Sequence, residues 1–327
     1  METLTINYLS HQRNECEKYW KITSHFLNKI DQKNKVKINL LLTEDSKNFE
    51  SYIDNRIKVS KYICNSYIEK IKIASESDTE FSMKLDEDVF FSNHVFDEFI
   101  KIANDKNSNG IYWPLISLNT SFSDIFIKKF IDSTDIKRKV EKEFLSVKFP
   151  RKFWNQNNVY LKLNKHTLFS KKWNEDSFKK TLKTVNSVFR GIHPVRLSYN
   201  AEVLINEYIQ NNFRKLFSEQ EYRLIEFENI YTTSNAYMMK TKYFEQYLKY
   251  RSFDDFDEVQ LNNFVNNENI KSFYLDNSYT IHTMFSTVKG RNKALRNKVT
   301  KEEAELYELN FVKNLNDYLF DEKLEDK

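Results

Sequence analysis

Glycine is almost absent from this chain of 327 residues. It occurs three times, at Gly110, Gly191 and Gly290, and positions so far apart cannot form a G-x-G-x-x-G or a Walker A loop. The sequence therefore argues against a Rossmann dehydrogenase, a P-loop NTPase and a protein kinase. If the protein handles phosphate groups, we expect it to bind them with a metal ion and side chains.

Cysteine is also scarce. Cys16 and Cys64 form neither a C-x-x-C pair nor a zinc-binding set, which fits a reducing compartment. The N-terminus carries Glu2 and lacks the basic and then apolar pattern of a signal peptide, and no apolar run approaches the length of a membrane span. We therefore expect a soluble, cytoplasmic protein without a transmembrane segment.

An excess of charge of one sign is missing as well. The chain has 51 Lys and Arg against 47 Asp and Glu, so the formal net charge of +4 does not indicate nucleic acid as a partner. Hydrophobic residues make up 40% and aromatic residues 15%, which is enough for a sizeable core and argues against disorder. A length of 327 residues allows one large or two small domains.

The most informative stretch is an apolar alternation that ends in three acids, Asp86, Glu87 and Asp88. If the backbone stays extended past Leu85, Asp86 and Asp88 point to one side and Glu87 to the other. Two such carboxylates repel each other unless a cation lies between them, and Mg²⁺ or Mn²⁺ prefers oxygen ligands of this kind. The alternative interpretation is a solvated acidic turn after an edge strand, because short motifs often arise by chance.

Hydrophobic periodicity predicts strands that alternate with helices in the first third of the chain. We expect strands at 4–9, 36–42, 57–59, 81–86 and 110–114, the last stopped by Pro114, and helices at 15–30, 64–74 and 94–104. This alternation predicts a mostly parallel α/β sheet flanked by helices, and ligands bind beyond the carboxyl ends of such strands. The polar residues expected to converge on that edge are His11, Arg13, Glu44, Asp45, Asp86 and Asp88.

The rest of the chain is less regular. We predict a helical insertion at about 120–200, a helix at 201–213, a strand ending near Met239 and a helix at 241–250. An acidic turn at 253–258 then opens a helix, and capping of that helix is the alternative role for its carboxylates. The remaining expected elements are short strands at 273–275 and 279–281, and a helix at 293–319. We expect one catalytic domain over residues 1–290 and a C-terminal helical extension over 291–327.

The order of these features resembles the nucleotide-sugar-dependent glycosyltransferases of the GT-A fold, in particular inverting, family-2-like members. The resemblance covers about residues 4–89 and 229–287. It is carried by the polar loop 10–14, by Leu-Leu-Thr-Glu-Asp-Ser at 41–46, by Lys-Leu-Asp-Glu-Asp at 84–88, by Thr-Ser-Asn-Ala-Tyr at 233–237 and by the acidic pair at 257–258. The chain departs from the family in its lack of glycines and in having Asp-Glu where Glu-Asp is commoner.

This resemblance implies a transfer of a hexosyl group from a nucleoside diphosphate-sugar, expected to be UDP-linked, to a hydroxyl of a glycan or glycolipid acceptor. It implies that Mn²⁺ or Mg²⁺ is held by Asp88, by Asp86 through water and by His282. Asp257 or Glu258 would be the catalytic base of a direct, inverting displacement. The implied donor-binding residues are Ser10, His11, Arg13, Glu44, Asp45, Asn65 and Asp86, and the acceptor-side residues are Trp113, Asn119, Ser234 and Asn235.

Several alternatives stay open from the residues alone. Trp113 and Trp154 could stack on a sugar, but aromatic side chains more often belong to a core. His282 could be a hydrogen-bonded structural residue instead of a ligand. A metal-dependent nuclease or phosphotransferase also places carboxylates at a strand end, and a non-catalytic nucleic-acid-binding protein is the third class to be tested.

Overall fold

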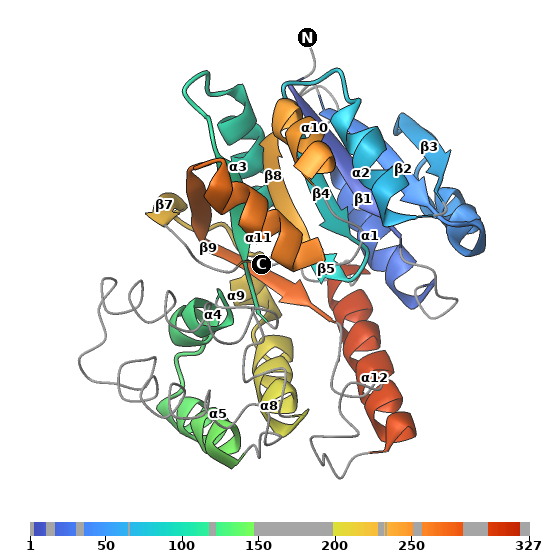
Figure 1. Ribbon diagram of the computed structural model, residues 1–327. Helices are drawn as coiled ribbons and strands as arrows, with labels where there is room; N and C mark the ends of the chain where they lie inside the picture. Colours follow the sequence, from blue (N-terminus) through green and yellow to red (C-terminus); the bar gives the residue numbers. More distant parts are fainter. Residues whose placement is uncertain are drawn as a thin grey trace. The chain divides into compact units, whose positions relative to one another are not determined.

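The computed structural model describes residues 3–10, 17–30, 36–64, 66–117, 122–146, 199–227, 232, 234–250, 257–283 and 300–320. This part of the chain is an α/β structure with a mixed, mostly parallel, open sheet flanked by helices (Figure 1). The predicted fold class is confirmed at this level. Among the described residues no helix is both long and apolar enough to cross a membrane.

The sheet has the strand order β3-β2-β1-β4-β8-β6-β9-β5, and β7 pairs with β9. Its strands are β1 (Leu4–Leu9), β2 (Val36–Leu42), β3 (Val59–Ile63), β4 (Phe81–Asp86), β5 (Val89–Phe90), β6 (Ile111–Ile116), β7 (Arg223–Phe227), β8 (Ala236–Lys240) and β9 (Ser272–His282). Strands β1 to β4 pair in parallel, whereas β8 is antiparallel to both β4 and β6.

The helices among the described residues are α1 (Glu17–Lys29), the 3-10 helix η3 (Glu44–Tyr52), α2 (Tyr67–Ser75), α3 (Asn93–Asn104), α4 (Phe122–Phe130), α5 (Thr134–Ser146), α8 (Tyr199–Gln210), α9 (Phe213–Phe217), α10 (Thr241–Tyr250), α11 (Asp257–Asn267) and α12 (Lys301–Phe320). Helices α1, α2, α3, α8, α10, α11 and α12 overlap predicted helices, whereas η3 and α9 were not predicted. Helices α2 and α10 pack against each other and on β4 (Figure 1). The face of the sheet that they cover is therefore buried, and the polar residues on this face are buried with it.

Local sequence explains why α2 and α3 begin where they do. Ser66 precedes α2, and its hydroxyl accepts a hydrogen bond from the Glu69 backbone N–H. The Ser66 backbone N–H in turn donates to the Glu69 carboxylate, which completes a capping box. Ser92 caps α3 in the same way through the Val95 N–H. Each cap satisfies a backbone donor that the first turn of a helix leaves unpaired.

Three local predictions were wrong. The two strands expected at 273–275 and 279–281 are one strand, β9, because Asn277 adopts a φ of 61° inside it and asparagine tolerates that conformation. Pro114 lies within β6 and does not end it. The residues of β6 that pair with β8 are Ile111 and Tyr112, so the missing N–H of the proline lies beyond these paired positions. The chain also leaves the extended conformation after Asp86 and turns at Glu87–Asp88.

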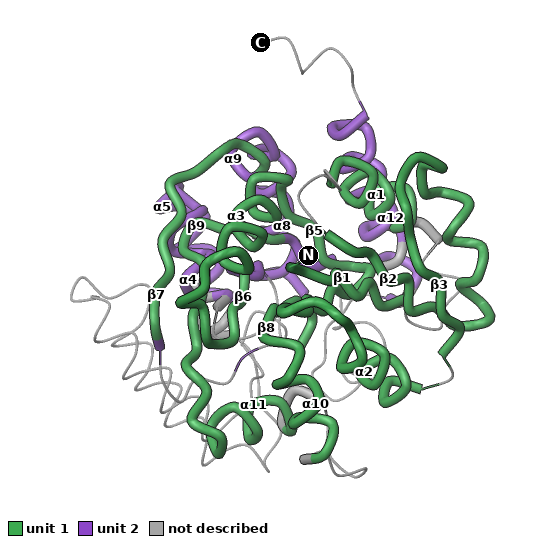
Figure 2. The backbone as a smooth tube through the Cα atoms, turned by 90° about the horizontal axis from the view of Figure 1, so that it is seen from above, with its two compact units in different colours: residues 1–114, 217–226, 234–280 green, residues 115–216, 227–233, 281–327 purple. Residues whose placement is uncertain are grey.

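The chain divides into two compact units (Figure 2). Unit 1 comprises residues 1–114, 217–226 and 234–280 and contains the parallel part of the sheet. Unit 2 comprises residues 115–216, 227–233 and 281–327. In unit 2, α8 packs against α5 and α12, and the ring of Phe213 contacts those of Phe311 and Tyr318 at centroid distances of 6.1 and 5.3 Å.

Candidate functional site

The strand order places a topological switch point between β1 and β4. From β1 the chain continues to β2 and β3 on one side of the sheet, and then returns to add β4 on the other side of β1. In open α/β sheets the crevice beyond the carboxyl ends of such strands is where ligands bind. Leu9 of β1 is in register with both Leu41 of β2 and Asp86 of β4, so these three strands end at one level. The residues that follow them form the candidate site.

Glu87 is tied to the end of β1. Its carboxylate accepts a hydrogen bond from the Ser10 hydroxyl at 2.5 Å, and its backbone N–H donates to the Leu9 carbonyl at 3.2 Å. The Glu87 carbonyl accepts from Thr23 of α1 at 3.3 Å. Glu87 is 1% exposed and Ser10 is fully buried, so this carboxylate lies inside the protein and the Ser10 hydroxyl is already engaged.

Asp86 is tied to the segment before β8. One carboxylate oxygen lies 2.6 Å from Lys84 Nζ, and the other accepts from the Asn235 side chain at 3.2 Å. The Asp86 backbone N–H donates to the Asn235 carbonyl at 2.9 Å. Lys84 Nζ also donates to the Ser234 carbonyl and lies 5.5 Å from the centroid of the Tyr67 ring. Asp86 therefore has a positive partner supplied by its own strand.

Lys70 is a second buried lysine of this region. It comes from α2, is 4% exposed, and its ammonium donates to the Ser10 carbonyl. Burial lowers the pKa of Lys70, and the negative charges of Asp86 and Glu87 oppose that shift. The two lysines and the two carboxylates balance each other in number.

Asp88 differs from its two neighbours because it is only partly buried. It stands in the turn between β4 and β5, so the expected extended geometry, with Asp86 and Asp88 on one side, was wrong. The alternative of a solvated acidic turn after an edge strand is also wrong, because β4 lies between β1 and β8 and Asp86 is 4% exposed. Among the described residues no group of three or more His, Cys, Asp or Glu side chains could hold a metal ion.

The structure places some predicted donor and acceptor residues without testing their roles. Glu44 and Asp45 are exposed at the start of η3, directly after β2. Ser234 and Asn235 meet Asp86, as described above. Trp113 is buried in β6 and packs against Tyr237 at a centroid distance of 6.5 Å, which is a core contact.

The predicted base and the remaining predicted ligands are only partly described. Asp257 and Glu258 are the first two residues of α11 in unit 1, which confirms the helix start, and their side chains lie outside the described set. His282 ends β9 in unit 2, is buried, and its backbone N–H donates to the Ser117 hydroxyl at 3.3 Å. The predicted residues that lie outside the described part of the chain are His11, Arg13, Asn65, Asn119 and Trp154.

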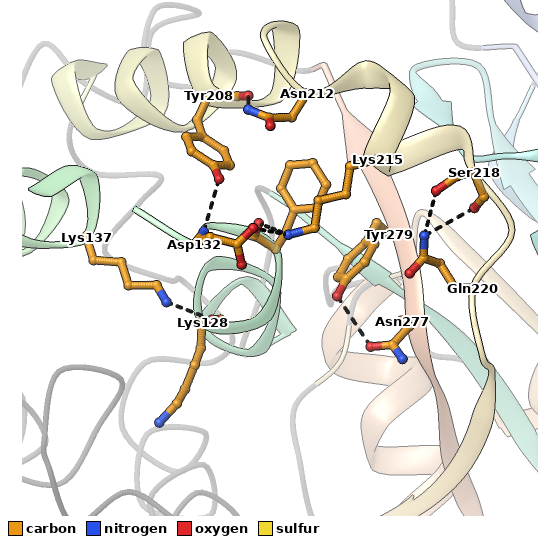
Figure 3. A network of polar contacts seen from close by, with 11 residues as sticks. Lys128, Asp132, Lys137, Tyr208, Asn212, Lys215, Ser218, Gln220, Asn277 and Tyr279 are labelled. Atoms are coloured by element: carbon orange, nitrogen blue, oxygen red, sulfur yellow. Dashed lines mark hydrogen bonds and ion pairs between the residues drawn. The ribbon is translucent and has the colours of Figure 1, made fainter. Parts of the chain in front are cut away.

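A separate cluster of lysines in unit 2 has a structural explanation. Lys137 donates to the Lys128 carbonyl at 2.9 Å, and Lys215 donates to the Phe130 carbonyl at 2.7 Å and to Asp132 at 2.6 Å (Figure 3). These carbonyls belong to the last turn of α4, where cations are favourable. Burial and the neighbouring charge of Lys137 lower the pKa of Lys128 to about 8.

Sequence reasoning missed Lys70, Lys84 and the internal role of Glu87. The apolar alternation of the strand puts Lys84 at a polar position, and the pattern of the helix at 64–74 assigns no role to Lys70. A usable signal for Lys84 was present: it lies two positions before Asp86, and side chains two apart on a strand share one face. Lys70 carried no such signal, because its partner is a backbone carbonyl 60 positions away.

Comparison with protein-family models found none that matches this chain, and a search of curated protein sequences found no significant match.

Proposed function

We propose that this protein is a metal-dependent, GT-A-like glycosyltransferase that moves a sugar from a nucleoside diphosphate-sugar, expected to be UDP-linked, to a hydroxyl of a glycan or glycolipid acceptor. One observation carries this proposal: the acidic residues 86–88 lie at the carboxyl end of β4, at the switch point between the parallel strands β1 and β4. That position suits a ligand with phosphate groups when no glycine loop is available. The same residues belong to one of the segments that carry the resemblance to the GT-A family.

The donor chemistry of the turn fits one divalent cation. Asp88 is partly exposed and offers oxygen ligands of the type that Mn²⁺ and Mg²⁺ prefer, whereas both oxygens of Asp86 already accept hydrogen bonds. Asp88 would therefore hold the ion, with Asp86 in an outer position. When bound, the ion would offset the charge that develops on the leaving diphosphate.

The chain's own residues would carry out the proton transfer. Asp257 and Glu258 stand at the first turn of α11, and we assign the role of base to one of this pair. The base removes the proton of the acceptor hydroxyl while that oxygen bonds to the anomeric carbon and the diphosphate leaves with the electron pair of the broken bond. A single displacement of this kind inverts the anomeric configuration. Ser234 and Asn235, held against Asp86, would border the acceptor side.

A thermal-shift measurement with UDP tests this function. UDP at about 100 times its dissociation constant adds about 2.7 kcal/mol of stability, which corresponds to a rise in Tm of roughly 5 °C. We expect this rise to need Mn²⁺ or Mg²⁺ and to be lost in the Asp88→Asn variant, measured against the Tm of that variant without ligand.

Three assays separate the proposal from its rivals. Hydrolysis of UDP-sugars by the metal-loaded protein supports a transferase. Cleavage of nucleic acid with Mn²⁺ would point to a nuclease, and metal-independent binding of nucleic acid that weakens steeply with salt would point to a binding protein. Either of the last two results, without UDP binding, would overturn the proposal.

A further inference from the structure

We infer that Lys84 is the built-in counterion of Asp86, and that this pair positions the acidic turn against the Ser234–Asn235 segment. The inference concerns the same site and rests on the proposed function for the identity of the ligand. Its structural part stands on contacts within unit 1. Lys84 and Asp86 are positioning residues in this view and do not touch the reacting atoms.

The first step is the charge balance at Asp86. The Lys84 ammonium lies 2.6 Å from one Asp86 oxygen, and the two side chains are 2% and 5% exposed. A buried carboxylate with an ammonium at hydrogen-bond distance has its charge compensated already, so it gains little from a metal ion. A cation brought to Asp86 would also be repelled by Lys84.

The second step is what the pair holds in place. Lys84 donates to the Ser234 carbonyl, Asp86 accepts from the Asn235 side chain at 3.2 Å, and the Asp86 backbone N–H donates to the Asn235 carbonyl at 2.9 Å. Three contacts thus join the end of β4 to a segment about 150 positions later in the chain. Beyond this junction the two strands pair regularly, with Leu85 opposite Ala236. The donor-side turn and the acceptor-side segment are therefore set by one buried ion pair.

An ion pair that only stabilises the fold and an ion pair that positions a segment respond differently when both charges are removed. If the pair only stabilises the fold, removing both charges together should leave the Ser234–Asn235 segment as ordered as before. If the pair positions the segment, the same change should loosen it even where the overall Tm recovers. Lys240 provides the matched control: its ammonium lies 3.0 Å from Glu80 at the opposite end of the β4–β8 pair, where the Glu80 side chain is 54% exposed.

The first measurement is a stability cycle without ligand. Lys84→Met and Asp86→Asn each leave one buried charge without its partner, and we expect each to lower Tm by roughly 10 °C. The double variant, Lys84→Met with Asp86→Asn, should recover to within a few degrees of the wild type. Lys240→Met should change Tm by no more than about 2 °C. A Lys84→Met protein as stable as the wild type would overturn the counterion assignment.

The second measurement uses the double variant, which decides the matter even where a single variant does not fold. We expect hydrogen exchange of the peptide containing residues 234–236 to be faster than in the wild type and in Lys240→Met. Unchanged exchange overturns the positioning role. If the wild type itself shows no Mn²⁺-dependent rise with UDP, the proposed function fails, while the stability cycle and the exchange measurement still decide the role of Lys84.

Discussion

Removing the Ser10 hydroxyl is the sharpest test of how the site is built. This hydroxyl donates to the Glu87 carboxylate at 2.5 Å, and both residues are buried. Ser10→Ala keeps the backbone contacts of residue 10, including the N–H that donates to Leu41 at 3.2 Å. The substitution therefore removes one hydrogen bond to a buried charged acceptor and little else.

The magnitude follows from the type of acceptor. A hydrogen bond to a charged group contributes about 1.5–3 kcal/mol and a neutral one about 0.5–1.5 kcal/mol. Ser82 is the matched control, because it is as buried as Ser10 and lies in the neighbouring strand, but its hydroxyl has only uncharged partners, the Ala74 peptide carbonyl at 3.1 Å and the Thr241 hydroxyl at 3.0 Å. We expect Ser10→Ala to lose about 2 kcal/mol and Ser82→Ala about 1 kcal/mol of unfolding free energy.

Urea denaturation of the wild type and both variants measures these values, with an unchanged m-value as the sign that the denatured state is not altered. Adding Glu87→Gln and the double variant Ser10→Ala with Glu87→Gln completes a cycle, in which we expect a coupling energy of about 1 kcal/mol. If Ser10→Ala costs no more than Ser82→Ala and the coupling is close to zero, Glu87 is not held by Ser10 in solution, and our description of the site is wrong.

Three further predictions follow from other parts of the chain. The folded-state pKa of Lys128 is about 8, below its ordinary 10.5, so the unfolded chain binds more protons between these pH values and stability rises with pH in that window. Lys128→Met should therefore raise Tm at pH 7, and this gain should shrink as pH rises from 8 to 10.5. Lys129→Met is the control. Gly110→Ala would place a Cβ 2.7 Å from the Lys271 carbonyl, and we expect a loss of about 1–3 kcal/mol in urea denaturation; a neutral effect would show that the backbone there can move. Asp257→Asn should lower the turnover of UDP-sugars roughly 10²–10⁴-fold if Asp257 is the base, and full activity would leave Glu258 as the candidate.

Much of the fold could be predicted because local patterns decided it. Strands β1 and β2 carry dense apolar runs between polar loops, and α10 begins directly after β8 and ends where its apolar periodicity stops. Prediction failed where a single residue overrode the pattern. Asn277 reads as a turn residue, yet it continues β9 with a positive φ. Helix η3 was not predicted because its buried positions, Ser46 and Phe49, are too few to give a helical period.

The site could be predicted only in its position along the chain. The acidic residues after β4 and the convergence of strand ends followed from the alternation of strands and helices. Their partners did not, because Lys70 comes from α2 and Asn235 from a segment 149 positions away. Local periodicity assigned Lys84 to a polar face, whereas α2 and α10 cover that face in the structure. A sheet covered on both faces does not leave alternate residues to solvent.

The sequence Lys-x-Asp-x-Asp at 84–88 contains the counterion for its own first acid. Because Lys84 and Asp86 both lie in β4, their side chains share one face, and on a covered face the ammonium and the carboxylate must meet or stay unpaired. Asp88 follows the end of the strand and lies in a partly exposed turn. The repulsion between two carboxylates was our reason to expect a cation between Asp86 and Asp88, and Lys84 removes that reason for Asp86. What still favours a metal ion is the partly exposed Asp88 beside a switch point, which is why the Asp88→Asn variant, and not an Asp86 variant, decides the metal dependence.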